Sequence, residues 1–149
     1  MDLSNNAAHI LIVDDDQGIR DRLARYLLEN GFRATTANDA ASARASMRGL
    51  AFNVVILDVM MPGENGLDLA RDLKAVSNTP ICVLSARADP EDRIEGFEIG
   101  VDDFVPKPFE PRELVLRLQN ILETRARFVR SPRGDQDGRL RLPCRPRRA

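Results

Sequence analysis

Several side chains that can bind a metal or take part in group transfer each follow closely after a short apolar run. They are Asp14, Asp15, Asp16, Asp58, Ser85 and Lys107. Carboxylates that lie close together repel one another unless a cation joins them, and oxygen ligands favour a hard divalent ion such as Mg²⁺. A carboxylate beside such an ion can keep one oxygen free as a nucleophile. If these residues meet, they form a site for phosphoryl transfer onto an aspartate.

The apolar runs and the stretches between them predict alternating strands and helices. The expected strands are residues 9–13, 32–37, 54–57, 80–84 and 102–105. Between them, apolar residues recur at helical spacing, as in Ile19, Leu23 and Leu27 behind the capping residue Asp16. Further helix faces are expected over residues 40–50, 69–76, 90–99 and 111–124. Strands that are apolar throughout favour a parallel sheet covered on both faces, and right-handed crossovers make it a doubly wound α/β sheet of five strands and five helices.

This fold class predicts where the polar residues meet. In open parallel sheets, ligands bind beyond the carboxyl ends of the strands. Asp14 and Asp15 follow the first strand, Asp58 the third, Ser85 ends the fourth and Lys107 follows the fifth. Taken singly, each of these residues reads equally well as a turn, a helix cap or an exposed side chain. Their convergence on one edge of the sheet is what indicates a site with an acceptor, a metal and a counter-charge.

The net charge of −1 hides an asymmetry between two regions. Residues 1–124 carry 13 Lys and Arg against 21 Asp and Glu, whereas residues 125–149 carry 9 Arg against 2 Asp. We therefore expect an acidic domain over residues 1–124 and a disordered basic linker or tail over residues 125–149. No apolar run is long enough to span a bilayer, and the N-terminus lacks a basic, apolar leader. These features predict a cytoplasmic location.

Four motifs resemble the successive signatures of response-regulator receiver domains in two-component signalling. They are Ile10-Leu-Ile-Val-Asp-Asp-Asp16, Val55-Ile-Leu-Asp-Val-Met-Met-Pro-Gly63, Val83-Leu-Ser-Ala86 and Gly100-Val-Asp-Asp-Phe-Val-Pro-Lys-Pro-Phe109. The resemblance covers residues 8–124, and its order and spacing make it specific. It implies a flavodoxin-like receiver with strand order 2-1-3-4-5, an order already known for a member of this family.

The resemblance also implies a role for each residue of the site. Asp58 would accept a phosphoryl group from the phosphohistidine of a sensor histidine kinase. Mg²⁺ would be held by Asp14, Asp15, Asp58 and the backbone carbonyl of Met60. Lys107, followed by a cis Pro108, would contact the phosphoryl group. Ser85 would follow that group inward and let Phe104 change rotamer, with Ser in place of the commoner Thr and Phe in place of the frequent Tyr. The chain would accept phosphoryl on its own aspartate and would not act as an enzyme on another substrate.

Within this family, the sequence is most similar to receivers of winged-helix transcription factors of the OmpR/PhoB type. These form phosphorylation-promoted dimers, and Arg93 with Glu113 and Asp103 with Arg117 resemble two of their ion pairs. A third pair lacks its basic partner, because Gln119 stands opposite Glu98, so we expect a weaker dimer. The DNA-binding half is absent from this sequence. A fragment, a shifted reading frame and a true single-domain regulator all remain open.

Three other functions are alternatives to this one. A stand-alone receiver that acts by protein contact or as a phosphorelay shuttle would use the same chemistry without binding a promoter. A phosphatase of the haloacid type also uses a strand-end aspartate with Mg²⁺, but it needs a second acid two residues later, where this chain has Met60. A nucleotide-binding enzyme is disfavoured because the chain has neither GxxxxGK[ST] nor GxGxxG.

Overall fold

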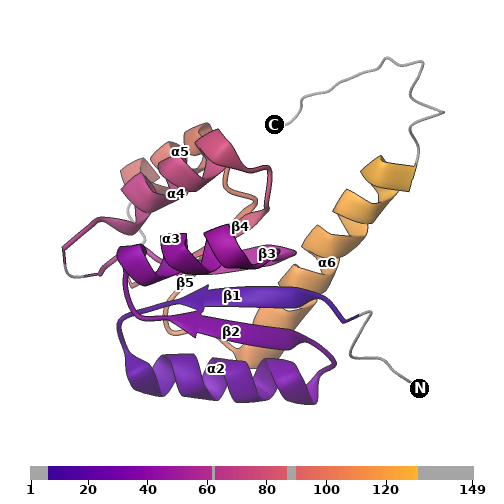
Figure 1. Ribbon diagram of the computed structural model, residues 1–149. Coiled ribbons are helices and arrows are strands. Elements are labelled where there is room, and N and C mark those ends of the chain that lie inside the picture. The colour runs from indigo at the N-terminus through magenta and orange to yellow at the C-terminus, as the bar shows by residue number, and fades with distance from the viewer. Residues whose placement is uncertain (1–6, 62, 87–89, 131–149) are drawn as a thin grey trace.

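The computed structural model describes residues 7–61, 63–86 and 90–130 of the chain, and in these ranges strands and helices alternate (Figure 1). The elements in chain order are β1 (His9–Val13), α2 (Gln17–Glu29), β2 (Arg33–Ala37), α3 (Ala40–Gly49), β3 (Val54–Asp58), α4 (Gly66–Val76), β4 (Ile81–Ser85), α5 (Pro90–Ile99), β5 (Asp103–Pro106) and α6 (Pro111–Arg130). The five strands form one sheet in the order β2-β1-β3-β4-β5, with every neighbouring pair parallel. The predicted doubly wound fold is therefore confirmed.

The register of the sheet brings the strand ends of the predicted site together. Val13 is paired with Leu57 across β1 and β3, and Asp58 is paired with Leu84 across β3 and β4. Ser85 is in turn paired with Pro106, directly before Lys107. Because all strands are parallel, their carboxyl ends share one edge of the sheet. The central strand β3 thus places Asp58 between the ends of β1 and β4.

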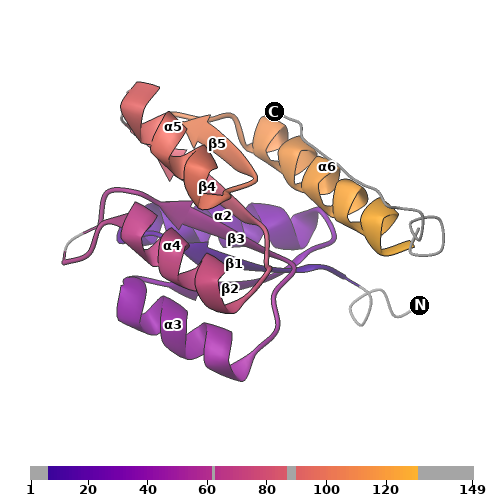
Figure 2. The ribbon, with the colours of Figure 1, turned by 90° about the horizontal axis from the view of Figure 1, so that it is seen from above.

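Helices cover both faces of the sheet, as strands without alternating polarity require. On one face, side chains of β1, β3 and β4 such as Leu11, Val55 and Val83 form a buried cluster with residues of α3 and α4. On the other face, Ile12, Ile56 and their neighbours form a second cluster with residues of α2 and α6. Figure 2 shows α3, α4 and α5 as a row along the first face. Successive residues of β1, β3 and β4 point to opposite faces of the sheet, and nearly all of them are buried. This close packing on both faces holds the ends of these strands in fixed positions.

The observed boundaries differ from the predicted ones mainly at the edges of elements. Strands β2, β4 and β5 each begin one residue later than expected, and β3, β4 and β5 each end one residue later. The edge strand β2 is half exposed, unlike the central strands, because it has a neighbour on one side only. Helix α6 continues through Arg130, past the expected end at Thr124. Of the expected linker, residues 131–149 lie outside the described residues.

Three helices begin at the capping residues that the local sequence provides. The carboxylate of Asp16 accepts the Ile19 N–H at 3.2 Å, as predicted, and Asn65 accepts the Leu67 N–H at 2.7 Å. Asp39 caps α3 in the same way. Such caps satisfy backbone donors that the first helical turn leaves free.

Within the described residues, no helix is long and apolar enough to cross a membrane. The cytoplasmic location stays a prediction.

Candidate functional site

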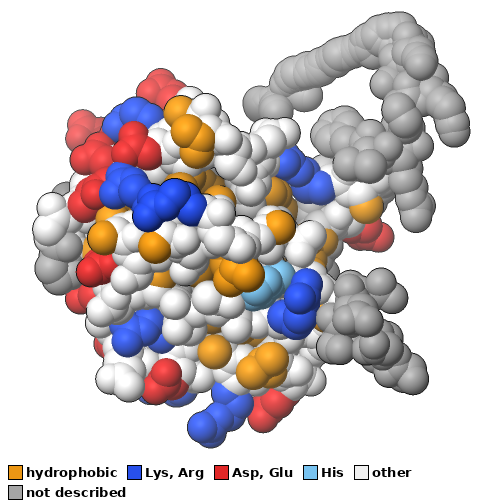
Figure 3. All heavy atoms as spheres, viewed as in Figure 1, with side chains coloured by type: hydrophobic (Ala, Val, Ile, Leu, Met, Phe, Trp, Pro, Cys, Tyr) orange, Lys and Arg blue, Asp and Glu red, His pale blue; other side chains and the backbone are white. Residues whose placement is uncertain are grey.

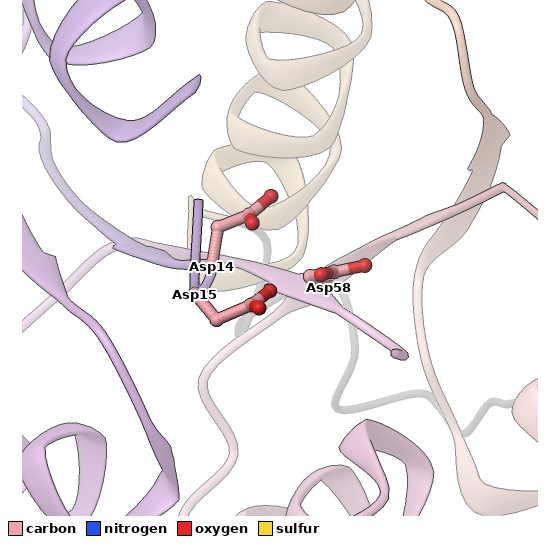
Figure 4. Close-up of side chains that lie close together, drawn as sticks. All are labelled: Asp14, Asp15 and Asp58. Atoms are coloured by element: carbon pink, nitrogen blue, oxygen red, sulfur yellow. The ribbon is translucent and has the colours of Figure 1, made fainter. Parts of the chain in front are cut away.

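Three carboxylates meet at the carboxyl edge of the sheet (Figure 4). Asp14 and Asp15 follow β1, Asp58 ends β3, and one oxygen of each lies within 4.8 Å of one oxygen of the others. Asp14 and Asp58 are buried, being 1% and 3% exposed, whereas Asp15 is exposed. The site thus has a dry interior and one open side. The predicted convergence of these residues is what the geometry shows.

Backbone groups fix the two buried carboxylates. The N–H of Asp16 donates to Oδ1 of Asp14 at 2.9 Å, and the guanidinium of Arg20 donates to the backbone carbonyl of Asp14 at 2.7 Å. The N–H of Met60 donates to Oδ1 of Asp58 at 3.3 Å. Hydrogen bonds to an ionised carboxylate are stronger than neutral ones. These backbone N–H groups therefore orient each carboxylate through one of its oxygens, Oδ1.

Lys107 supplies the positive charge that the sequence predicted. Its ammonium lies 3.1 Å from Oδ2 of Asp14 and 3.4 Å from Oδ1 of Asp58, and its side chain is 17% exposed. The N–H of Lys107 donates to the carbonyl of Ser85 at 2.7 Å, which joins the end of β5 to the end of β4. The Lys107–Pro108 peptide bond is cis, as the resemblance implied. Lys107 therefore faces both buried carboxylates from one side.

The charges at the site are only partly balanced. Burial and the negative charge of Asp14 raise the pKa of Asp58, while Lys107 and the hydrogen bond from the Met60 N–H lower it, and the net result is a pKa of about 6. Burial alone lowers the pKa of Lys107, but the carboxylates of Asp58 and Asp14 outweigh it, so that the pKa is raised and the ammonium stays charged. One ammonium therefore faces three carboxylates, and ionised Asp58 carries an electrostatic penalty in the absence of a further cation.

The donor set of this site suits a hard divalent cation. The three clustered ligand atoms are all carboxylate oxygens, the pKa of Asp58 is raised by burial and by Asp14, and the exposed side at Asp15 leaves room for water. Mg²⁺ prefers one or two carboxylates together with several waters. The residues present therefore fit Mg²⁺. The carbonyl of Met60 as a further ligand stays a prediction.

Ser85 and Phe104, which the resemblance implies as switch residues, are both buried, and their switch role stays a prediction. Ser85 is fully buried at the end of β4, one residue beyond the partner of Asp58. Phe104 is 4% exposed and packs in the cluster on the face covered by α3 and α4. Gly96 of α5 lies directly against it, since a Cβ there would come within 3.3 Å of the Phe104 ring. In this structure the aromatic side chain is therefore in its inward position.

Of the four predicted dimer-face residues, three are joined within the single chain. Both carboxylate oxygens of Asp103 accept from Arg117 at 2.9 Å, and Arg117 also donates to Glu113 at 2.9 Å. Arg93 is exposed on α5. Exposed apolar side chains lie nearby on the same helices, with Ile94 58% and Leu116 64% exposed. The structure thus gives Asp103 and Arg117 an intramolecular pairing that the sequence did not predict.

Three residues that matter to the site were not identified from the sequence. Arg20 binds the carbonyl of Asp14 from one turn into α2, and nothing in an isolated arginine signals this contact. Gly66, the first residue of α4, lies so close to β3 that a Cβ there would be 2.3 Å from the carbonyl oxygen of Asp58. Glu64, in the loop after β3, is bound by Arg44 of α3. The dipeptide Asn65-Gly66, a helix cap followed by a glycine, is a local signal for this close approach, because glycine has no Cβ to clash with the strand.

The family model for the response regulator receiver domain matches residues 10–119. The chain is 54% identical over 120 residues to Protein PetR of Rhodobacter capsulatus, covering 80% of this chain and 51% of that protein. It is 40% identical over 136 residues to Transcriptional regulatory protein GltR of Pseudomonas aeruginosa, covering 89% of this chain and 56% of that protein. The solved receiver domain of Francisella response regulator 1452 is 34% identical, with a TM-score of 0.75 over 78% of this chain and 98% of that one.

The parallel 2-1-3-4-5 sheet with acidic residues at its carboxyl edge defines the class of receiver domains. The chain belongs to the response regulator receiver domain family, since the family model covers well over half of it. It spans about half the length of the curated relatives that it matches.

Proposed function

We propose that this chain is the phosphoryl-accepting switch of a two-component system, with Asp58 as the acceptor. The observation that carries the proposal is the environment of the Asp58 carboxylate. It is buried at the end of the central strand, flanked by two further carboxylates, and faced by the ammonium of Lys107 at 3.4 Å. A charged nucleophile held among groups that can neutralise incoming oxygens is what phosphoryl transfer needs.

The proposed step transfers a phosphoryl group from a phosphohistidine of a sensor kinase. A carboxylate oxygen of Asp58 forms a bond to phosphorus while the bond from phosphorus to the imidazole nitrogen breaks, and the released imidazole takes up a proton. Lys107 stabilises the negative charge on the phosphoryl oxygens, because its ammonium already lies between Asp58 and Asp14. No described side chain near Asp58 has to act as a general base, since the nucleophile is already ionised above its pKa of about 6.

Asp14, Asp15 and Asp58 would hold Mg²⁺, which when bound neutralises charge on the transferred group. The residues of this chain supply the rest of the site. Asp14 is oriented by the Asp16 N–H, and Asp58 by the Met60 N–H. Burial of both carboxylates limits the access of water to the acceptor. The chain acts in this proposal as an acceptor, with slow loss of its own phosphoryl group as the only turnover.

Phosphorylation would act as a population shift between two forms of the surface made by α5, β5 and α6. The hydroxyl of Ser85 would follow the phosphoryl group, and the Phe104 ring would then move. Support comes from the positions of the two residues: Ser85 is one residue beyond the strand partner of Asp58, and Phe104 packs directly against Gly96 of α5. A small change at the acceptor can therefore be passed to α5 by contact.

The output that we propose is transcriptional regulation through a DNA-binding domain that works together with this receiver domain. Support comes from GltR, whose name describes a transcriptional regulatory protein, and from the share of about half that this chain covers of its relatives. The alternative is a stand-alone receiver that works by protein contact or as a phosphorelay shuttle. Reading the genomic DNA directly downstream for a winged helix, in frame or shifted, decides between the two outputs.

We further propose that phosphorylation promotes a weak homodimer through the face of Arg93, Asp103, Glu113 and Arg117. The exposed apolar residues Ile94 and Leu116 flank these charges and support a contact between copies. Because Asp103 and Arg117 are already paired within one chain, a dimer that used them would have to share or exchange partners. This cost agrees with the expectation of a weaker dimer.

Intact-mass spectrometry after incubation with acetyl phosphate tests the acceptor chemistry. We expect the mass of one phosphoryl group on the wild-type chain in the presence of Mg²⁺ and none after chelation. Asp58→Asn should remain unmodified, whereas Asp21→Asn, which removes an exposed carboxylate of α2, should behave like the wild type. Modification that persists in Asp58→Asn would assign the phosphoryl group to another residue and overturn the proposal.

A further inference from the structure

The loop between β3 and α4, residues 59–65, borders the acidic site. Met60 donates its N–H to Asp58, and an open hollow beside the site is lined by Asp15 together with loop residues including Met60 and Glu64. The start of the loop is fastened to the sheet, and the first residue of α4 is fastened to the start of the loop. The N–H of Val59 donates to the carbonyl of Leu84 at 3.0 Å, and the N–H of Gly66 donates to the carbonyl of Val59 at 2.8 Å. Between these ends, the positions of residues 60, 61, 63, 64 and 65 depend on further contacts with neighbouring elements.

Arg44 of α3 holds the loop from outside. Its guanidinium donates to both carboxylate oxygens of Glu64, at 2.9 and 2.7 Å, and also to Asp72 of α4 at 2.6 Å. The side chains of Arg44 and Glu64 are about one-third exposed, at 32% and 30%. Hydrogen bonding to Arg44 lowers the pKa of Glu64, so the pair stays charged at neutral pH. A bidentate arginine–carboxylate contact fixes the orientation of the carboxylate as well as its distance from the guanidinium.

The contact joins three separate elements at one point. Arg44 comes from α3, Glu64 from the loop, and Asp72 from the middle of α4. Figure 3 shows basic and acidic side chains gathered side by side over the region of α4 and α5. The ion pairs of Arg71 with Asp68 and Glu95 join α4 to itself and to α5, and that of Lys74 with Asp102 joins α4 to the residue before β5, so that none of these reaches the loop. Arg44 is thus the cation that anchors the loop within the described residues.

We propose that Arg44 is a positioning residue: its grip on Glu64 holds the 59–65 loop so that the Met60 N–H faces Asp58, and thereby sets the affinity of the acidic site for a divalent cation. This inference rests on the proposed function of the site. Arg44 binds neither the cation nor the phosphoryl group itself. It acts through Glu64, which lies four residues after Met60 in the same short loop.

The test compares two variants. Arg44→Met keeps much of the side-chain length and loses the positive charge, whereas Arg44→Lys keeps the charge and loses the guanidinium that donates to both oxygens of Glu64. Arg71→Met is the matched control, because Arg71 also bridges two helices but makes no contact with the loop. Mg²⁺ is added to ¹⁵N-labelled protein, and its Kd is read from backbone amide shifts. We expect Kd to rise roughly 3- to 10-fold in Arg44→Met, less in Arg44→Lys, and less than about 1.5-fold in Arg71→Met.

A second measurement needs no metal. In metal-free protein, the hydrogen exchange of the Met60 amide should be faster in Arg44→Met than in the wild type, and unchanged in Arg71→Met. Glu64→Gln should weaken Mg²⁺ binding as well, and the double variant with Arg44→Met should be little worse than either single one, because both changes remove the same contact. Additive effects would show that the two residues act separately.

The results separate this inference from the proposed function. Wild-type affinity for Mg²⁺ and an unchanged Met60 amide in Arg44→Met would overturn the positioning role, even if urea unfolding showed a loss of stability. Failure of the wild-type chain to bind Mg²⁺ would overturn the proposed function instead, and the exchange of the Met60 amide would still decide whether Arg44 holds the loop.

Discussion

The ammonium of Lys107 lies 3.4 Å from a carboxylate oxygen of Asp58, although β3 and β5 are not neighbours in the sheet. The long side chain of Lys107 reaches past the end of β4, where its own N–H is held by the Ser85 carbonyl. The contact is therefore a consequence of the strand order: a lysine after β5 reaches the central strand by crossing one intervening strand end.

Replacing Lys107 with Met should raise the pKa of Asp58 further above about 6 in metal-free protein. The reason is that burial and Asp14 would then act on Asp58 without opposition from a positive charge. A ¹³C NMR titration of the side-chain carboxyls measures this directly. Lys74→Met is the control, because Lys74 lies 3.5 Å from Asp102 and does not contact the acidic site. An unchanged or lower pKa of Asp58 in Lys107→Met would contradict the charge balance described here.

Asp58→Asn should stabilise the metal-free chain at pH 7.5 and not at pH 3.5. Because the pKa of Asp58 is raised from 3.8 to about 6, the folded chain holds this proton more tightly than the unfolded chain does. The associated stability is present below about pH 4 and is lost as the pH rises through about 6. Asparagine cannot ionise, so the variant avoids this loss, and we expect it to be about 1–3 kcal/mol more stable at pH 7.5.

Urea unfolding in the presence of a chelator measures this difference. Asp21→Asn, at an exposed position of α2, should change the free energy of unfolding by less than about 0.5 kcal/mol at either pH. Added Mg²⁺ should stabilise the wild type and have little effect on Asp58→Asn. Equal stability of Asp58→Asn and wild type at both pH values would mean that ionised Asp58 is not penalised in the folded chain.

Gly66→Ala should be strongly destabilising because the new Cβ would lie 2.3 Å from the Asp58 carbonyl oxygen and 2.6 Å from the Val59 Cα. The clash involves backbone atoms of the central strand, which cannot move aside as a flexible side chain can. We expect a loss of about 2–3 kcal/mol or more in the free energy of unfolding. Gly49→Ala, at the end of α3, meets nothing within 4 Å and should be neutral or slightly stabilising. A mild effect at Gly66 would argue against the close approach of α4 to β3.

Loading with beryllofluoride should produce a weak dimer, and Leu116→Glu should abolish it. Leu116 is 64% exposed on α6, one residue before Arg117, and a carboxylate there would place a buried charge in the contact. Analytical ultracentrifugation over a range of concentrations measures the association. Leu28→Glu, which is on helix α2 outside the proposed dimer face and 58% exposed, should leave the dimer intact. A loaded wild-type chain that stays strictly monomeric would show the dimer prediction to be wrong, without affecting the role of Asp58.

Much of the fold could be predicted because the local signals are consistent. Buried strands such as His9–Val13 carry no alternating polarity, and Asp16 provides a helix cap where the period changes. The full length of α6 could not be predicted, because Arg125 and its neighbours carry the charge pattern of a solvated tail. In the structure, the guanidinium of Arg125 donates to the backbone carbonyl of Asn78, a contact across the fold that no local pattern contains.

The residues of the site could be predicted from the sequence, but the contacts that hold the surrounding elements in place could not. Parallel strand ends share one edge, so the positions of Asp14, Asp58 and Lys107 follow from topology alone. The contacts of Arg44 with Glu64 depend on how α3 packs beside the 59–65 loop. The pairing of Arg117 with Asp103 depends in the same way on the packing of α6 against β5. Side-chain reach across packed elements is a property of the tertiary structure, and a single sequence does not encode it in any local pattern.

The hydrogen bond from the Gly66 N–H to the Val59 carbonyl closes the loop after β3 into a ring of fixed length. This backbone hydrogen bond does not depend on side chains, whereas the insertion or deletion of a residue between Val59 and Gly66 would move Gly66 away from the strand. Anyone redesigning this site, by directed evolution or by grafting, should therefore vary the identities of Met60 and Met61, keep Glu64 for its contact with Arg44, and leave the number of residues between Asp58 and Gly66 unchanged.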